Sequence, residues 1–492
     1  MTNRSSWAQP LVTFQRYLSG MFFKQFYDQP LAQASYLIGC QATGEAIVVD
    51  PLRDPAPYLL AAKTEGLRIT HVTETHIHAD FVSGARELRA ATGAQLFLSA
   101  EGGTDWQYAF AASDGATLLR DGDHIMVGNI RLDVWHTPGH TPEHLSFVVT
   151  DTPRAAGAMG IITGDFVFVG DVGRPDLLEK AAGVANTMEE GARTLFRSLQ
   201  RFRTLPDHLQ VWPGHGAGSA CGKALGAVPS STVGYEKLAN WGVATTDEHE
   251  FVQMVLEGQP EPPRYFAEMK RINRDGAPIL GDLVALPQQD GPTVARRVLS
   301  ASPAVWCIDL RPARAFAERH VPGSLSVPYG KSFSTWVGSI VPYDVDVVLV
   351  APAGDASGVA SARADPLRIG MDRVTGWVDA DELLSAYTAA GGAPSHIEWR
   401  PIASDAVRDG TLPVVDVRGR SEWMAGHLPA ARHIPLGELT DHLGDLPTGP
   451  FGVHCQSGAR SAIATSLLHR LGRTDAINLE GGYAAWRITS PQ

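Results

Sequence analysis

The sequence predicts an α/β protein of more than one domain, and three observations lead to this prediction. A chain of 492 residues is longer than one hydrophobic core can fill, since domains contain roughly 100 to 200 residues. Short apolar, β-branched runs alternate with turns rich in glycine and proline between residues 21 and 240. The C-terminal part of the chain contains an internal repeat, which indicates two related domains.

The first part of the chain carries polar clusters directly after its predicted strands. These strands read AIVVD, RITHVTET, RLDVW, HLSFVV, GIIT and LQVW. Residues at strand ends and in the following loops can converge on one site while the sheet holds them in place. Imidazole and carboxylate together suit zinc, iron or manganese, and two histidines with one carboxylate leave the open positions typical of non-haem Fe(II) sites. The candidate residues are His76, His78, Asp80, His140, Asp165 and His215.

A stretch with several prolines and a helical segment closes this first part. Residues 257–278 read EGQPEPPRYFAEMKRINRDGAP. Because prolines interrupt regular structure, we interpret this stretch as the end of the first domain leading into a connector. The first domain with its connector is therefore predicted to cover residues 1–285.

The repeat relates two segments at a constant offset of 107 residues. CIDLRPARAFAERHVPGSLSVP begins at Cys307, and VVDVRGRSEWMAGHLPAARHIP begins at Val414. Each copy starts with an apolar strand ending in aspartate, continues into a helical stretch and returns with a second strand, as in a parallel α/β sheet. Two tandem α/β domains are predicted, at 286–390 and 391–492. The identical pairs are Asp309/Asp416, Arg311/Arg418, His320/His427, Pro322/Pro429 and Pro328/Pro435.

The second copy contains a candidate nucleophile, Cys455, between an apolar strand and a helix in GVHCQSGARSAIATSLLHRLG. Backbone N–H groups and the helix dipole at such a turn stabilise a thiolate and an anion docked above it. Arg460 adds a positive charge that suits a sulfonate or thiosulfate group. The alternative is a buried structural cysteine, which seldom begins a glycine-containing turn that ends in arginine. The residues between them, expected to bind substrate, are Gln456, Ser457, Gly458 and Ala459.

The first copy lacks this chemistry. Its corresponding loop reads APAGDASG, with Ala351 at the cysteine position and Ala356 at the arginine position. Without sulfur there is no covalent intermediate. Cys307 lies in the preceding strand and is interpreted as a core residue, so residues 286–390 are predicted to be an inactive domain.

The order THxHAD, TPGHT, TGD and PGHG resembles the metallo-β-lactamase superfamily over residues 21–240. This resemblance implies an αββα sandwich with a metal at one edge of the sheets. Two-metal hydrolases of the superfamily similar to glyoxalase II use HxHxDH, whereas this chain has Phe81 at the last position. An aromatic ring has no lone pair to donate to a metal, so a mononuclear site is favoured.

Three segments resemble those of the persulfide dioxygenase branch of the superfamily: FFKQFYDQPLAQASYLIG, THIHADFVSG and GDVGRPDL. The resemblance implies one Fe(II) per chain, bound by His76, His140 and Asp165. It also implies that Arg174 lies near the anionic end of the substrate, where its guanidinium gives bidentate recognition; the alternative for Arg174 is a surface ion pair. The residues expected to orient the ligands by hydrogen bonds are His78, Asp80 and His215.

The second repeat copy resembles the rhodanese family of sulfurtransferases. Its loop from Cys455 to Arg460 matches the signature CxxGxR, and Asp416 and Arg418 precede GHLPAARHIP. The first copy resembles an inactive rhodanese-like domain. The fold class expected for the whole chain is thus a metallo-β-lactamase-type sandwich followed by two rhodanese-like α/β domains.

The two resemblances together imply a fusion with two linked activities. A low-molecular-weight thiol persulfide, such as glutathione persulfide, would be oxidised by O2 to sulfite and thiol at the iron. Cys455 would move sulfane sulfur between persulfide, sulfite and thiosulfate, in either direction. A zinc thioester hydrolase similar to glyoxalase II is one alternative, and a noncatalytic sulfur carrier or sensor is another.

Composition narrows the partners and the location. A formal charge of −12 with no basic stripe disfavours nucleic acid. No run reaches the roughly 18 apolar residues of a membrane helix, and the N-terminus has no continuous apolar segment of an export signal, so a cytoplasmic location is expected. The four cysteines show no CxxC spacing, which disfavours a disulfide framework or a zinc finger. A homo-oligomer is expected, as for most soluble enzymes.

Overall fold

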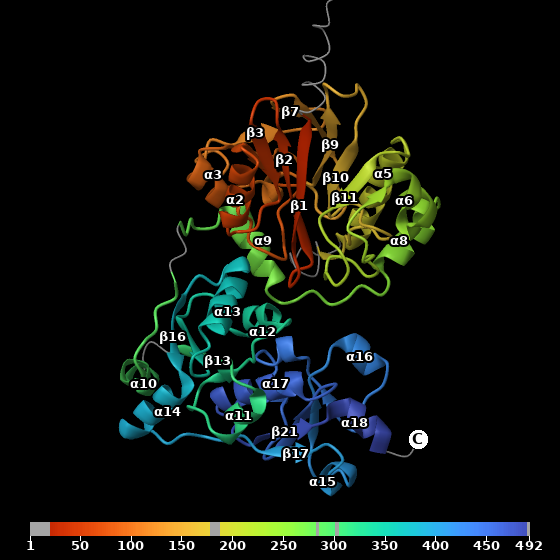
Figure 1. Ribbon diagram of the computed structural model, residues 1–492. Helices are drawn as coiled ribbons and strands as arrows, with labels where there is room; N and C mark the ends of the chain where they lie inside the picture. Colours follow the sequence, from red (N-terminus) through yellow and green to blue (C-terminus); the bar gives the residue numbers. More distant parts are fainter. Residues whose placement is uncertain (1–19, 178–186, 282–284, 301–304, 490–492) are drawn as a thin grey trace, which may run out of the picture. The chain divides into compact units, whose positions relative to one another are not determined.

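The computed structural model describes residues 20–177, 187–281, 285–300 and 305–489 (Figure 1). Residues 1–19, on which the expectation about export rests, lie outside this part. Contacts divide the chain into unit 1, Met1–Pro262 with Phe266–Leu283, and unit 2, Pro263–Tyr265 with Val284–Gln492. Within the described residues, no helix has the length and apolar character needed to cross a bilayer.

Unit 1 contains two six-stranded sheets. The first sheet runs β1 (Met21–Asp28), β2 (Gln33–Cys40), β3 (Glu45–Val49), β4 (Arg68–Thr73), β5 (Gln95–Ser99) and β6 (Thr117–Leu119). The second runs β12 (Ser231–Thr232), β11 (Gln210–Pro213), β10 (Gly160–Gly164), β9 (Leu145–Asp151), β8 (Ile130–His136) and β7 (His124–Val127). Strands β7 to β10 pair antiparallel, and β10 pairs parallel with β11. The ends of β8, β10 and β11 and the start of β9 therefore gather at one edge.

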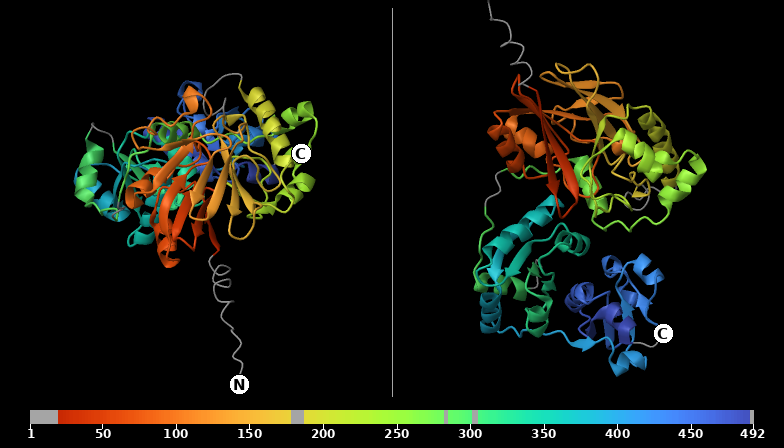
Figure 2. Two further views of the ribbon diagram at one scale, coloured as in Figure 1. Left: turned by 90° about the horizontal axis from the view of Figure 1, so that it is seen from above. Right: turned by 45° about the vertical axis from the view of Figure 1, so that its right-hand side comes forward.

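The two sheets pack face to face, with helices on their outer faces (Figure 2). Strand β2 contributes to both cores, because its successive side chains point to opposite faces of the sheet. Leu37 joins the core under the first helical layer, whereas Tyr36 and Ile38 join the core between the sheets. The predicted αββα sandwich is thus confirmed. The helices are α2 (Ala56–Thr64), α3 (Ala85–Thr92), η1 (Thr104–Trp106), α5 (Met188–Arg203), α6 (Val233–Ala239), α7 (Trp241–Ala244), α8 (Glu248–Leu256) and α9 (Phe266–Asp275).

Unit 2 contains two parallel sheets. The four-stranded sheet runs β14 (Leu325–Ser326), β13 (Trp306–Asp309), β15 (Val347–Ala351) and β16 (Val374–Asp379). The five-stranded sheet runs β17 (Trp399–Pro401), β21 (Ala476–Glu480), β20 (Phe451–His454), β18 (Val414–Asp416) and β19 (Arg432–His433). The helices are α10 (Gly291–Leu299), α11 (Ala313–Glu318), α12 (Phe333–Ile340), α13 (Ala356–Arg368), α14 (Ala380–Ala389), α15 (Asp405–Arg408), α16 (Arg420–Met424), η2 (Leu436–Glu438), η3 (Leu443–Asp445), α17 (Ala459–Arg470) and α18 (Gly482–Thr489).

Residues that are 107 positions apart make equivalent side-chain hydrogen bonds in the two copies of unit 2. In the second copy, Arg418 Nη2 donates to Asp416 Oδ2 at 2.7 Å and to the Gly426 carbonyl at 2.8 Å. His427 Nδ1 lies 3.1 Å from the Trp423 carbonyl oxygen. The repeat read from the sequence is therefore present in the fold. The residues that make the same contacts in the first copy are Arg311, Asp309, Arg319, His320 and Phe316.

The two copies form one compact unit by their contacts. The N–H of Ser326, at the end of β14, donates to Ser466 Oγ of α17 at 3.0 Å. The separate domains at 286–390 and 391–492 consequently remain a prediction, as does the boundary after residue 285, which lies beside the undescribed residues 282–284.

Candidate metal centre and candidate thiol site

The structure brings His76, His140 and Asp165 together in the interior of unit 1. All three are buried, and their ligand atoms lie within 4.8 Å of one another. Asp165 Oδ2 is 3.5 Å from His140 Nε2 and 4.0 Å from His76 Nε2. Neither carboxylate oxygen of Asp165 has a hydrogen-bond partner in the described part of the chain. A buried carboxylate facing two imidazoles without hydrogen bonds is the arrangement that a cation would satisfy.

The histidines of this group favour the neutral form. Burial, reinforced by the neighbouring histidines, lowers the pKa of His76 well below its ordinary value. Burial also lowers the pKa of His140. Neutral imidazole is the form that donates a lone pair to a metal.

Hydrogen bonds on the outer ring nitrogens orient both imidazoles. His140 Nδ1 donates to the Arg174 carbonyl oxygen at 3.0 Å, which turns Nε2 toward the site. His76 Nδ1 lies 2.9 Å from Thr75 Oγ1, and that hydroxyl donates to Asp50 Oδ2 at 2.9 Å. Such partners fix the tautomer and the ring orientation of metal-binding histidines.

Asp50 is a supporting residue that the sequence reasoning missed. It is fully buried and adopts a left-handed backbone with φ of 52°, a conformation that costs free energy in a non-glycine residue. Its carboxylate also lies 3.1 Å from His78 Nε2. Burial would lower the pKa of His78, but Asp50 and the other carboxylates near it raise it to about 9. The position of Asp50 at the end of the strand AIVVD was the available signal.

The three predicted orienting residues divide into two groups. His78 reaches His76 through Asp50 and Thr75. Asp80 and His215 lie on the other side of Asp165, where His215 Nε2 is 3.2 Å from Asp80 Oδ2 and 3.5 Å from Asp165 Oδ1. The hydrogen bond of His215 goes from Nδ1 to the Ala32 carbonyl. An orienting role for Asp80 and His215 remains a prediction.

Two motif glycines allow the loops to approach closely. Gly164 has φ of 49°, and a Cβ there would lie 2.6 Å from Thr75 Oγ1. A Cβ on Gly214 would lie 2.6 Å from Asp165 Oδ1. The glycines of TGD and PGHG therefore leave room for the ligand side chain and its support.

Helix α9 lies in the stretch that the sequence analysis interpreted as the end of the first domain, and its Asn273 holds the loop that carries His76 and His78. Its Nδ2 donates to the carbonyl oxygens of His78 at 2.8 Å and Phe81 at 2.7 Å. Its Oδ1 accepts from the Ser83 N–H at 2.9 Å. Phe81 is fully buried, and its ring packs 4.4 Å from that of His78. This position thus supplies packing and no ligand atom.

Arg174 is fully buried, and its guanidinium makes internal bonds. Nε and Nη2 donate to Asp176, both at 2.8 Å, and Nη1 donates to the Ala220 carbonyl at 2.8 Å. The ion pair that was the alternative for Arg174 is present, but it is buried and not on the surface. A substrate-binding role stays a prediction, whereas the contact of its carbonyl with His140 is a support that the sequence did not suggest.

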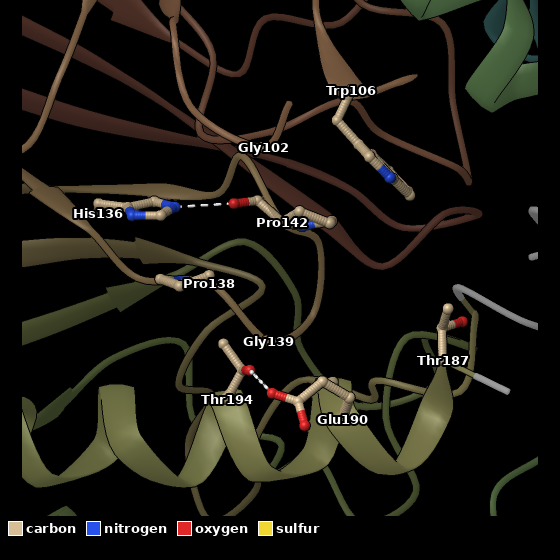
Figure 3. Close-up of a pocket in the computed structure, with 10 residues that line it drawn as sticks. Gly102, Trp106, His136, Pro138, Gly139, Pro142, Thr187, Glu190 and Thr194 are labelled. Atoms are coloured by element: carbon tan, nitrogen blue, oxygen red, sulfur yellow. Dashed lines mark hydrogen bonds between the residues drawn. The ribbon is translucent and has the colours of Figure 1, made fainter. Parts of the chain in front are cut away.

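A cavity of about 640 Å³ lies between the loop that carries His140 and the N-terminal half of α5 (Figure 3). Pro138 and Gly139, directly before His140, form part of its wall, and the loop is closed by a contact of 2.7 Å between His136 Nε2 and the Pro142 carbonyl. Its size is that of a pocket for a small organic molecule. The lining residues are Gly102, Trp106, His136, Pro138, Gly139, Pro142, Thr187, Glu190, Gly191 and Thr194.

In unit 2, Cys455 follows β20 and lies in the turn that leads into α17. The thiol is buried, and the Gly458 N–H donates to Sγ at 3.1 Å. Gly458 has φ of 109°, which side-chain-bearing residues rarely adopt. The Tyr483 N–H donates to the Cys455 carbonyl, and the Ala484 N–H to that of Gln456. The loop is thus fixed with sulfur toward the helix N-terminus.

Arg460 lies on the first turn of α17 and pairs with Glu422 of α16. Its Nη1 and Nη2 donate to the two carboxylate oxygens at 2.5 and 2.7 Å. The hydrogen bonds from Arg460 lower the pKa of Glu422, and Glu422 in turn raises the pKa of Arg460. The sequence reasoning missed Glu422. The repeat carried a signal, because the first copy has Ala315 at this position and also lacks the arginine.

Comparison with known proteins shows the family. The model of the metallo-beta-lactamase superfamily matches residues 28–215, and that of the rhodanese-like domain matches residues 401–489. The crystal structure of a metallo-beta-lactamase from Staphylococcus aureus subsp. aureus COL is 41% identical, covers 73% of this chain and 99% of that chain, and has a TM-score of 0.64. The chain belongs to the metallo-beta-lactamase superfamily. It carries a C-terminal rhodanese-like domain, as the sequence predicted.

Within the metallo-beta-lactamase superfamily, two kinds of relative stand close to unit 1. The mitochondrial persulfide dioxygenase ETHE1 of Homo sapiens is 29% identical over 198 residues, 40% of this chain and 68% of that protein. The hydroxyacylglutathione hydrolase of Rhodospirillum rubrum is 31% identical over 180 residues, 37% of this chain and 60% of that protein. Unit 1 is therefore similar both to a dioxygenase and to a hydrolase. Which of the two activities is proposed for it depends on the residues of the site.

Proposed function

We propose that unit 1 is a mononuclear Fe(II) persulfide dioxygenase and that the rhodanese-like domain is a sulfurtransferase acting through Cys455. One thiol persulfide, such as glutathione persulfide, one O2 and one water would give one thiol, one sulfite and two protons. The observation that carries this proposal is the buried group of His76, His140 and Asp165, in which the Asp165 carboxylate has no hydrogen-bond partner among the described residues.

The donor set fits iron. Two neutral imidazoles and one carboxylate fill one face of a metal ion and leave positions for other ligands. Bound there, Fe(II) would supply a redox centre with open positions at which sulfane sulfur and dioxygen react. The chain's own residues set the geometry, because Thr75 and the Arg174 carbonyl hold His76 and His140 in the orientation that directs Nε2 inward.

The surrounding residues also exclude water and seat the substrate. The ligands are at most 2% exposed, so bulk solvent does not compete for their lone pairs. The cavity beside Pro138 and Gly139 would receive the organic part of the thiol. His140 directly follows Gly139 in the wall of this cavity, so the seated thiol would lie next to the loop of the proposed iron ligands.

At Cys455, the thiolate would attack the sulfane sulfur of a persulfide, break its S–S bond and release the thiolate of the carrier. Sulfite would then attack the outer sulfur of the enzyme persulfide, forming thiosulfate and returning the Cys455 thiolate. The Gly458 N–H, which already donates to Sγ, would stabilise the thiolate at both stages. Arg460 lies on the same turn and would bind the sulfite or thiosulfate oxyanion.

A zinc thioester hydrolase is the second candidate, favoured by the similarity to hydroxyacylglutathione hydrolase. Such an enzyme uses a metal-bound hydroxide and consumes no oxygen. The lack of a ligand atom at Phe81 and the rhodanese-like domain favour the dioxygenase.

Two parallel assays separate the candidates. The full chain is loaded with Fe(II) or with Zn(II) and given glutathione persulfide in an oxygen electrode, or S-lactoylglutathione in a hydrolysis assay. We expect oxygen uptake with stoichiometric sulfite from the iron form alone, and little thioester hydrolysis from either form. Thioester hydrolysis by the zinc form without oxygen uptake by the iron form would replace the proposal with the hydrolase.

A further inference from the structure

The lining of the cavity beside the His140 loop indicates the class of thiol that it would hold. Its polar part includes Glu190 and Thr194, which stand side by side on α5 across the cavity from Trp106 (Figure 3). Among the described residues that line it, Glu190 is the one acid, and there is no lysine or arginine. The rest of the wall is largely apolar and consists of Trp106, Pro138, Pro142 and three glycines.

The polar groups of the wall are suited to accept hydrogen bonds from a ligand. Thr194 Oγ1 lies 3.4 Å from Glu190 Oε1 and donates to it. His136 Nε2 already donates to the Pro142 carbonyl at 2.7 Å. A ligand therefore meets carboxylate and hydroxyl oxygens, which pair with hydroxyl or ammonium groups.

The positive charges on α5 next to the cavity are compensated within the protein. Arg197 Nη2 donates to Glu190 Oε1 and to Thr194 Oγ1, both at 2.7 Å. The positive end of the α5 dipole is met by Glu189 and Glu190 in the first turn of the helix. This side of the cavity thus offers an anion a carboxylate and a cation that is already paired.

Lys270 is the basic side chain behind the opposite wall. Its Nζ lies 3.8 Å from the centroid of the Trp106 ring. Burial lowers the pKa of Lys270, and the carboxylates of Glu143 and Asp105 act in the opposite direction. The charge of Lys270 is therefore also balanced by acidic neighbours.

We propose that the cavity selects a carrier thiol whose organic part has no net negative charge. Hydroxyl or ammonium groups of the carrier would bond to Glu190 and Thr194, and its carbon skeleton would pack on Trp106. The inference rests on the proposed function, since it names the class of thiol whose persulfide is oxidised. Glu190 would set KM and leave kcat to the iron site. Glutathione persulfide, which carries more carboxylates than ammonium groups, would still be oxidised at saturating concentration.

The test compares three persulfides of similar size that differ at the far end of the carrier. The persulfides of cysteamine, 2-mercaptoethanol and 3-mercaptopropionate end in an ammonium, a hydroxyl and a carboxylate group. Initial oxygen uptake by the iron-loaded full chain gives KM and kcat for each. We expect KM to be about two- to fivefold higher for the carboxylate than for the other two, the range of exposed charge pairs. Glu190→Lys should reverse this order at similar kcat.

Glu189→Lys is the matched control on the same turn. Glu189 pairs with Arg193 at 2.7 Å, as Glu190 does with Arg197, but it is not among the lining residues. This variant should keep the wild-type order of KM values. A KM for the carboxylate persulfide as low as the others in wild type, or equal shifts in the two lysine variants, would overturn the proposal.

Binding of the three parent thiols separates this proposal from the proposed function. Ligand-observed NMR titrations with the full chain should give Kd values in the same order, lowest for the ammonium and hydroxyl thiols. Equal or unmeasurable affinities would overturn the charge preference. If no persulfide supports oxygen uptake, the proposed function fails, whereas the order of these Kd values still decides the class of carrier.

Discussion

Asn273 offers a sharp test of the idea that α9 holds the loop that carries His76 and His78. Its side chain makes hydrogen bonds of 2.7 to 2.9 Å with backbone groups of His78, Phe81 and Ser83. At about 1 kcal/mol for each hydrogen bond, the change Asn273→Ala should lower the free energy of unfolding of unit 1 by about 3 kcal/mol. For a domain of this size the corresponding fall in Tm is about 6 to 12 °C.

Scanning calorimetry of the full chain can measure this shift. The transition of unit 1 is identified as the one that moves to higher temperature when iron is added. The loop that loses its support carries His76, so chelator should also remove iron faster from Asn273→Ala. Arg271→Ala is the control on the same helix, because Arg271 is exposed and pairs with Glu268, three residues earlier on that helix. Equal Tm values and equal iron loss for the two variants would refute the role assigned to Asn273.

Three further outcomes follow from the two sites. Cys455→Ser should lose thiosulfate sulfurtransfer and keep oxygen uptake with persulfide; loss of both activities in paired assays would contradict separate sites. Glu422→Gln should lower the KM for thiosulfate several-fold at similar kcat, because Arg460 is released for the anion; Glu438→Gln, which alters the pair with Arg420, should not, and equal kinetics for both variants would disprove the effect. Asp80→Asn should retain bound iron in metal analysis, since Asp80 is outside the group of His76, His140 and Asp165; iron loss matching that of His76→Ala would place it among the ligands.

The strands and the grouping of His76, His140 and Asp165 could be predicted because their signals are local. RITHVTET and GIIT are strands with polar residues at their ends, and β4 and β10 occupy these segments. The gathering of His76 and Asp165 follows from strand ends meeting at one edge of a sandwich. The repeat was equally readable, since Asp309 and Asp416 begin the same hydrogen-bond pattern.

The missed residues act across distances that local patterns do not record. Asn273 bonds a loop 192 residues earlier in the chain, and its helix reads as an ordinary amphipathic segment after prolines. Glu422 and Arg460 pair between two helices that are separated in the chain by strands β19 and β20.

The most direct measurement of the central claim is oxygen uptake per bound iron with glutathione persulfide, for wild type and Asp165→Asn. We predict that wild-type protein binds one iron in the group of His76, His140 and Asp165 and consumes one O2 for each sulfite formed. Asp165→Asn should lose iron and oxygen uptake together while Cys455 still transfers sulfur. Full oxygen uptake by Asp165→Asn, or by wild-type protein that contains no iron, would contradict the account.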